Sequence, residues 1–218
     1  MEMLQKINFI AHASKRIVDD KALYAQLVIT RNCNLSCAYC NEYTTGAPHI
    51  PVETLIGHIN MLDDLGVLIY DILGGEPLMH PALSDLVAHI KTKQHGANLV
   101  TVISNGFLLT SKIIESLNAA GLDLMQISVD SVHPGSQSMK SLKSLLPKLR
   151  MLNEQARFTV KVQTVLTPET AAEYQDFRQL LAGFPFEFSF SFLHQAGGRI
   201  AISGKQYLEL FDQQQLWG

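Results

Sequence analysis

The sequence predicts an α/β fold built on a parallel sheet. Short β-rich apolar runs alternate six times with stretches of helical periodicity along the chain. The 218 residues are 47% hydrophobic and 17% charged, and no linker or change of composition divides them. Because parallel strands need a crossover connection, each apolar run and the helical stretch after it indicate a right-handed βα unit.

The first 22 residues precede these units and carry apolar side chains at roughly helical spacing. We expect a helical extension, residues 1–22, that packs on a single domain, residues 23–218. A helix lying on a membrane surface is the alternative. No apolar run reaches the roughly 20 residues of a membrane span, and the N-terminus lacks the continuous apolar stretch of a secretory signal.

Six apolar runs are expected to be strands. Residues 67–75, VLIYDILGG, are apolar almost throughout, which is typical of a strand covered on both faces. Residues 186–194 instead alternate between apolar and polar side chains, as in a half-buried strand. In chain order the expected strands are 23–30, 67–75, 98–106, 122–130, 157–167 and 186–194.

Six helices are expected after these strands. Pro51 opens the first and Gly66 closes it, whereas Thr110 caps the third and Gly121 ends it. Pro147 predicts a kink or a boundary in the fourth. In chain order the expected helices are 51–66, 80–93, 110–121, 138–155, 168–183 and 204–217.

Periodicity does not decide between an open barrel and an open doubly wound sheet, but in both folds functional residues follow the carboxyl ends of strands. The unusual motifs fall there. After three cysteines come GGEP (74–77), SNG (104–106), SVD (128–130) and HQAGGR (194–199). Each motif alone is typical of a turn, and Asp130 alone of a turn cap. Together they predict a ligand pocket at one edge of the sheet.

All three cysteines, Cys33, Cys37 and Cys40, lie within eight residues. Their odd number and tight spacing argue against a secreted disulfide framework and favour a reducing cytoplasm. Three buried thiols, a zinc site with His49 or His58 as fourth ligand, and an iron–sulfur cluster remain open. In a cubane cluster, three thiolates would leave one iron free for another ligand.

The charge pattern argues against a nucleic acid partner. The net charge is −3, so no global basic excess is present to hold a phosphate backbone. The densest basic group is expected to be the solvated face of a helix; it consists of Lys140, Lys143, Lys148 and Arg150.

The chain resembles the radical S-adenosylmethionine (radical SAM) superfamily. Cys33-x3-Cys37-x2-Cys40 matches its cluster motif, including an aromatic residue, Tyr39, before the last cysteine. GGEP at 74–77 matches its GGE motif after the second strand, and the likeness covers residues 23–200 approximately. The resemblance implies a partial (β/α)6 TIM-like barrel with an N-terminal helix.

The resemblance also implies a chemistry. Cys33, Cys37 and Cys40 would ligate three irons of a 4Fe–4S cluster, and SAM would bind the fourth. Glu76 would accept hydrogen bonds from the SAM ammonium group, and Gly74 and Gly75 would let the backbone approach closely. The remaining residues expected to contact SAM are Tyr39, Ser104, Asn105, Ser128, Asp130, Thr164 and His194. An electron donor such as flavodoxin or ferredoxin would reduce the cluster.

The substrate is expected to be a small metabolite from which a 5′-deoxyadenosyl radical abstracts hydrogen. No cysteine remains to hold a second cluster, which argues against branches with cysteine-rich extensions, including many peptide-maturing enzymes and the molybdenum-cofactor cyclase. An activase or modifying enzyme acting on a protein or peptide is the first alternative, and a non-catalytic zinc or iron–sulfur module is the second. No cap covers the expected barrel mouth, so we expect the substrate, a partner or a further segment to close it.

Overall fold

A computed structural model describes residues 3–19, 21–41, 43–135, 138–167, 170–192 and 202–215. Its centre is one six-stranded sheet in which every adjacent pair is parallel and the strand order follows the sequence. A doubly wound sheet reverses its strand order, so this arrangement is the open barrel. The strands are β1 (Tyr24–Thr30), β2 (Ile69–Gly74), β3 (Leu99–Ser104), β4 (Leu124–Val129), β5 (Thr159–Leu166) and β6 (Glu187–Phe192).

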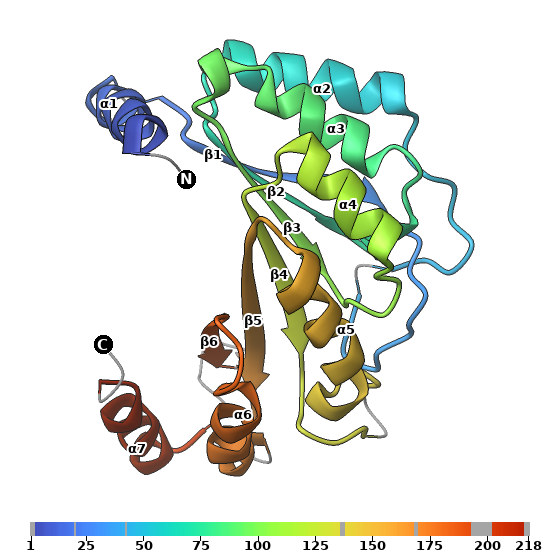
Figure 1. Ribbon diagram of the computed structural model, residues 1–218, viewed down its shortest axis with the longest axis vertical. Helices are drawn as coiled ribbons and strands as arrows, with labels where there is room; N and C mark the ends of the chain where they lie inside the picture. Colours follow the sequence, from blue (N-terminus) through green and yellow to red (C-terminus); the bar gives the residue numbers. More distant parts are fainter. Residues whose placement is uncertain are drawn as a thin grey trace.

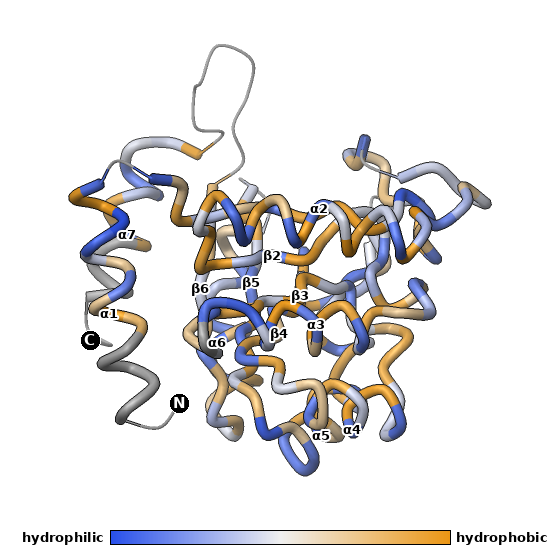
Figure 2. Tube along the Cα trace, turned by 90° about the horizontal axis from the view of Figure 1, so that it is seen from above, coloured by the Kyte–Doolittle hydropathy of each residue, from blue (hydrophilic) through white to orange (hydrophobic). Residues whose placement is uncertain are grey.

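The helices between the strands cover the outer face of the sheet. Neighbouring helices from the second to the fifth pack against one another in chain order (Figure 1). Figure 2 shows apolar and polar stretches alternating along α2 and α3, as one-sided burial requires. The α-helices are α1 (Met3–Val18), α2 (Val52–Asp64), α3 (Leu83–Lys91), α4 (Ser111–Ala120), α5 (Leu142–Gln155), α6 (Tyr174–Leu181) and α7 (Gly204–Gln215). The 3-10 helices are η1 (Pro77–Met79), η2 (Gln94–Gly96) and η3 (Thr170–Glu173).

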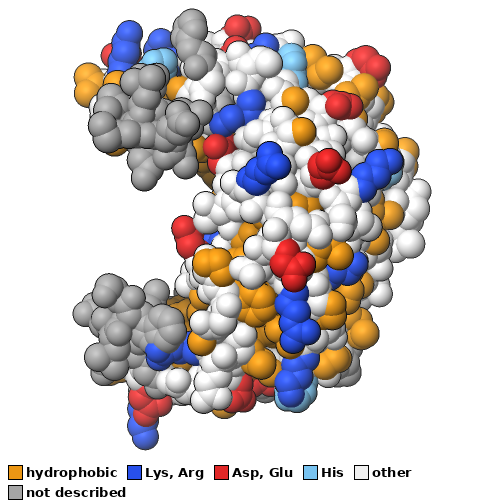
Figure 3. Space-filling view, viewed as in Figure 1, with side chains coloured by type: hydrophobic (Ala, Val, Ile, Leu, Met, Phe, Trp, Pro, Cys, Tyr) orange, Lys and Arg blue, Asp and Glu red, His pale blue; other side chains and the backbone are white. Residues whose placement is uncertain are grey.

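Alternate strand residues face the helices or the hollow inner side of the sheet. In β5, Val160 and Val162 are buried in the core, whereas Lys161 and Gln163 are only partly covered. Among the described residues β1 and β6 pair only with β2 and β5, so the barrel is partial. The surface is hollowed on this inner side (Figure 3).

Several helix boundaries differ from those expected. The fourth helix after β1 begins at Leu142 rather than 138, because Ser141 caps it by accepting from the Ser144 amide. Pro147 neither starts nor ends this helix, so a boundary there is wrong. It lies in the second turn, where its missing N–H removes one hydrogen bond, and buried leucines on both sides hold the helix to the core. The helix expected from residue 168 is described as η3 followed by α6.

The expected N-terminal helix is present as α1, whereas the division at residue 22 stays a prediction. Arg16 Nη2 donates to Gln94 Oε1 at 3.3 Å and so joins α1 to the domain. Ile10, Ile17 and Val18 are 61–83% exposed, so these three apolar side chains of the helix are largely uncovered. None of the helices described is both long and apolar enough to cross a membrane.

Candidate active site

The ends of β1, β2 and β3 meet in a tight junction, which we call the strand-end junction (Thr30–Asn32, Gly74–Glu76, Ser104–Asn105). The Gly75 amide donates to Thr30 O and the Glu76 amide to Asn32 O, both at 2.8 Å. A Cβ on Gly75 would lie 2.3 Å from Asn32 O, and one on Gly74, at φ +139°, 2.1 Å from Thr30 O. The two glycines are therefore needed to bring the end of β2 against the start of the cysteine segment.

Glu76 lies at the centre of this junction with no solvent-exposed surface. Its Oε1 accepts from Ser104 Oγ at 2.8 Å and from the Leu78 amide at 3.0 Å, and its Oε2 accepts from the Asn105 amide at 2.8 Å. Burial raises the pKa of this carboxyl, and the three hydrogen bonds oppose that rise. A carboxylate has about four acceptor positions, so one remains for a further donor.

The cysteine loop, residues 33–40, follows β1 and lies against the junction. Cys33 Sγ accepts from the Leu35 amide at 3.4 Å, and Asn105 Nδ2 approaches the same sulfur at 3.9 Å. Burial raises the pKa of the Cys33 thiol, and the negative charge of Glu76 adds to the rise. Glu76 therefore lies close enough to Cys33 for its negative charge to raise the pKa of the thiol.

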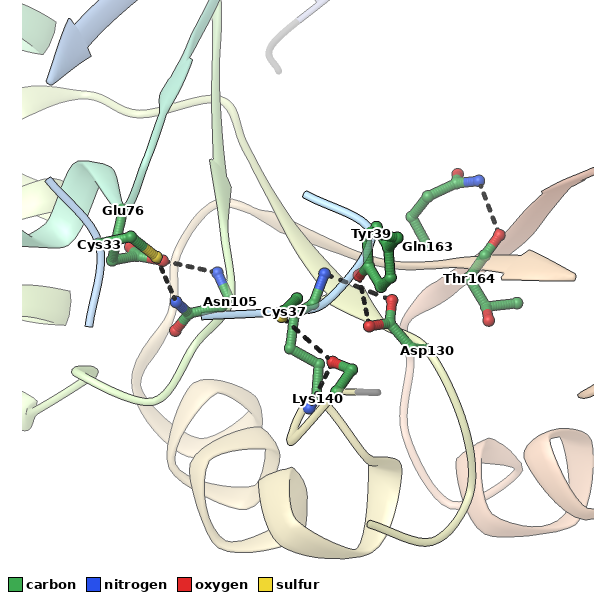
Figure 4. A network of polar contacts seen from close by, with 10 residues as sticks. Cys33, Cys37, Tyr39, Glu76, Asn105, Asp130, Lys140, Gln163 and Thr164 are labelled. Carbon is green, nitrogen blue, oxygen red and sulfur yellow. Dashed lines mark hydrogen bonds and ion pairs between the residues drawn. The ribbon is translucent and has the colours of Figure 1, made fainter. Parts of the chain in front are cut away.

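A second set of contacts joins the cysteine loop to the end of β4. Tyr39 Oη donates to Asp130 Oδ2 at 2.5 Å, and Lys140 Nζ lies 3.3 Å from Asp130 Oδ1 (Figure 4). The Lys140 ammonium also lies 5.2 Å from the centre of the Tyr39 ring. Burial and the Asp130 carboxylate both raise the pKa of Tyr39, which keeps its phenol protonated as the donor.

Two residues of this second set were not predicted as site residues. Lys140 was assigned to a solvated helix face, which is wrong because it precedes α5 and its side chain is 15% exposed. Ser138 Oγ lies 3.3 Å from Cys37 Sγ, and both residues are buried. The only sequence signal for them was their position a few residues after the fourth strand.

The other predicted residues fall in different places. Ser128 is partly covered on the inner face of β4. Thr164 is fully buried, and within the described part of the chain its hydroxyl has no hydrogen-bond partner. Its neighbour Gln163 points to the opposite side of β5 (Figure 4) and accepts a hydrogen bond from Ser189 Oγ. His194 lies outside the described residues.

The cysteine loop borders a hollow of about 460 Å³. Its lining residues are Cys33, Asn34, Leu35, Ser36, Cys37, Thr45, Gly135, Ser138 and Met139. In the part of the chain described, no three His, Cys, Asp or Glu side chains converge on a single metal ion. A cubane cluster does not need such convergence, because each cysteine binds a different iron. With hydrogen-bond donors already beside two of the sulfurs, the residues present fit a cluster held by thiolates.

Comparisons with known proteins agree with this geometry. The family model of the radical SAM superfamily matches residues 27–181. A GTP 3′,8-cyclase of Limosilactobacillus fermentum is 35% identical over 117 residues, which are 51% of this chain and 34% of the relative. A PqqA peptide cyclase of Xanthomonas oryzae pv. oryzae is 34% identical over 129 residues, 57% of this chain and 34% of the relative. The chain therefore spans about a third of the length of these curated relatives.

Solved structures show the same fold. SuiB of Streptococcus suis bound to S-adenosylmethionine superposes with a TM-score of 0.70 at 16% identity, over 94% of this chain and 48% of that one. The same protein bound to its precursor peptide SuiA gives a TM-score of 0.69, also at 16% identity, over 94% of this chain and 50% of that one. The partial barrel expected from the sequence is thereby confirmed.

Proposed function

The chain belongs to the radical SAM superfamily, and we propose that it uses this chemistry to take a hydrogen atom from a small-molecule substrate. Its cofactors are a 4Fe–4S cluster and SAM. Cys33, Cys37 and Cys40 would hold the cluster, and the bound cofactors would supply one-electron chemistry: reductive cleavage of SAM to methionine and a 5′-deoxyadenosyl radical able to abstract hydrogen. The observation that carries the proposal is the cysteine loop lying against a buried, hydrogen-bonded Glu76 at the carboxyl ends of the strands.

We assign the roles as follows. Cys33, Cys37 and Cys40 ligate the cluster, and Glu76 accepts from the SAM ammonium group at its remaining acceptor position. Ser104 donates its hydroxyl proton to Glu76 Oε1 and thereby orients that carboxylate. Water is excluded around Glu76 by its complete burial, which strengthens a charge-assisted hydrogen bond there.

A small-molecule substrate is the first candidate. A peptide substrate is the second candidate. It is favoured by the PqqA peptide cyclase among the relatives, although the lack of further cysteines argued against peptide-maturing branches. A GTP 3′,8-cyclase among the relatives favours a small molecule. An electron donor such as flavodoxin or ferredoxin and a cytoplasmic location stay predictions.

The cofactor chemistry is tested by anaerobic reconstitution with iron and sulfide. We expect a cluster by absorbance and by paramagnetic resonance after dithionite reduction, and 5′-deoxyadenosine after addition of SAM. Cys37→Ala should abolish both signals, whereas Ser14→Ala, an exposed change on α1, should leave both intact. Tightly bound zinc without a cluster would overturn the proposal and support a structural module, which should also unfold when the metal is removed.

The substrate class is tested next by deuterium transfer. Uniformly deuterated nucleotides and deuterated peptides are supplied separately, and 5′-deoxyadenosine is analysed by mass spectrometry. Deuterium taken only from a small molecule supports the proposal. Deuterium taken only from a peptide contradicts the first candidate and supports the second.

A further inference from the structure

The segment between β4 and α5 turns back onto the cysteine loop. The Asp130 amide donates to Lys140 O at 2.7 Å, and Ser131 forms an isolated parallel bridge with Ser141. These contacts fix both ends of the turn, so Ser138 and Met139, just before Lys140, are held in a defined position. Among the described residues of this turn, Ser138 places its hydroxyl beside a cysteine sulfur.

The Ser138 hydroxyl meets Cys37 where both side chains are largely buried. The distance from Oγ to Sγ is 3.3 Å, and the two residues are 9% and 8% exposed. Ser138 Oγ already accepts a hydrogen bond from the Lys140 amide at 3.1 Å. A hydroxyl has one proton to donate, and a cysteine that ligates iron is a thiolate with none. In the loaded protein the proton between these atoms therefore has to come from Ser138.

We propose that Ser138 is a positioning residue that donates a hydrogen bond to the Cys37 thiolate and raises the reduction potential of the cluster. The inference rests on the proposed function and adds a regulator of its electron-transfer step. Reduction adds one negative charge to the cluster, and a donor aimed at a ligating sulfur stabilises that charge. The low exposure of both residues strengthens the effect, because a hydrogen bond is electrostatically stronger where little water surrounds it.

The contacts among Tyr39, Asp130 and Lys140 hold the Ser138 hydroxyl opposite the Cys37 sulfur. Tyr39 belongs to the cysteine loop and Lys140 to the turn, and Asp130 binds both. The Ser138 hydroxyl, as a donor, also lowers the pKa of Tyr39, so the Tyr39 phenol oxygen is the competing acceptor for its proton. Tyr39 gives its own proton to Asp130, so its oxygen is neutral, and the thiolate is the stronger acceptor.

The test is a redox titration of the reconstituted full chain without SAM, in which dithionite supplies the electron and paramagnetic resonance measures the reduced cluster. Ser138→Ala should lower the ratio of reduced to oxidised cluster roughly tenfold at fixed potential, which is about 59 mV for one electron. Ser138→Thr keeps the hydroxyl and should restore the potential. Ser14→Ala is the control, because this exposed serine lies on α1, is not among the residues lining the hollow, and should change nothing.

The outcomes separate the two proposals. A wild-type chain that forms no cluster overturns the proposed function. A cluster with equal iron content and equal potential in wild type and Ser138→Ala overturns only the role of Ser138. A shift that appears solely in a Tyr39→Phe background would also overturn it, because the proton would then normally belong to Tyr39.

Discussion

The strand-end junction and the cysteine loop lie against each other but are held in different ways. The junction is fixed by backbone hydrogen bonds and by Glu76, which is fully buried. Within the cysteine loop, the backbone–backbone hydrogen bond that the structure describes joins Cys40 N to Cys37 O. Its other supports are side-chain contacts, and Tyr39 is 55% exposed.

The difference indicates that the junction and the cysteine loop have different roles. The junction forms with the fold and gives a rigid base at the ends of the strands. The cysteine loop is held by contacts that tolerate small movements, as a segment that has to admit a cluster requires. Substitutions in the junction should therefore reduce stability, whereas substitutions around the loop should mainly reduce retention of the cluster.

The largest effect is expected for Glu76→Ala. Three donors, Leu78 N, Ser104 Oγ and Asn105 N, would lose their acceptor inside the protein. An unsatisfied buried donor costs about 1–3 kcal/mol, so the free energy of unfolding should fall by about 3 kcal/mol or more. Urea unfolding of the cluster-free chain followed by circular dichroism measures it. Glu115→Ala on the exposed side of α4 is the control, and an equal loss there would contradict the special role of Glu76.

The second effect is expected for Gly75→Ala. The new Cβ would lie 2.3 Å from Asn32 O, so the end of β2 and the start of the cysteine segment have to separate. Overpacking of this kind costs about 1–3 kcal/mol, and the shift should also weaken cluster binding. Gly57→Ala is the matched control, because a Cβ there meets nothing within 4 Å and helix α2 should gain about 0.5–1 kcal/mol. The same urea titration should give opposite signs for the two variants.

The third effect concerns the side-chain contacts that hold the cysteine loop. Asp130→Asn removes the charge that binds Lys140 but leaves an acceptor for Tyr39. We expect stability of the cluster-free chain to fall by about 1 kcal/mol or less, and the cluster to be lost severalfold faster to an iron chelator. Glu209→Gln breaks the exposed ion pair with Lys205 and should change neither quantity. A large loss of stability with unchanged cluster retention would show that Asp130 stabilises the fold, as the junction does, rather than retaining the cluster.

The sequence predicted the sheet and its strand ends well because apolar runs and glycine or proline boundaries are local signals. The cysteines and Glu76 stand in motifs that are recognisable without a structure. Ser138 and Lys140 carry no such signal, because their contacts join residues about 100 positions apart in the sequence. The pair Gln163 and Thr164 shows another limit: a shift of one residue exchanges the two faces of a strand, and the predicted strand boundaries did not define that parity.

The smallest effect tests whether burial alone explains the loss of unfolding free energy expected for Glu76→Ala. Tyr70 is as deeply buried, but its hydroxyl has no hydrogen-bond partner among the described residues. Tyr70→Phe leaves no group unsatisfied, so we expect a change between zero and a stabilisation of about 1 kcal/mol at pH 7. A loss of 2 kcal/mol or more would mean that burial rather than partners determines the cost.

Tyr70→Phe should also change how the free energy of unfolding depends on pH in alkaline solution. Burial, with a smaller contribution from Asp63, raises the pKa of Tyr70 to about 12, above its ordinary value of 10.0. Above pH 10 the unfolded chain releases this proton more readily than the folded one, so the stability present below pH 10 declines as the pH rises to 12. Tyr70→Phe should make that decline shallower in urea titrations at pH 9, 10 and 11, while the raised pKa values of Cys33, Tyr24, Tyr39 and Tyr174 maintain the rest of it. An unchanged slope would show that the Tyr70 hydroxyl reaches water in the folded protein, and the contrast with Glu76 would then rest on exposure rather than on hydrogen bonding.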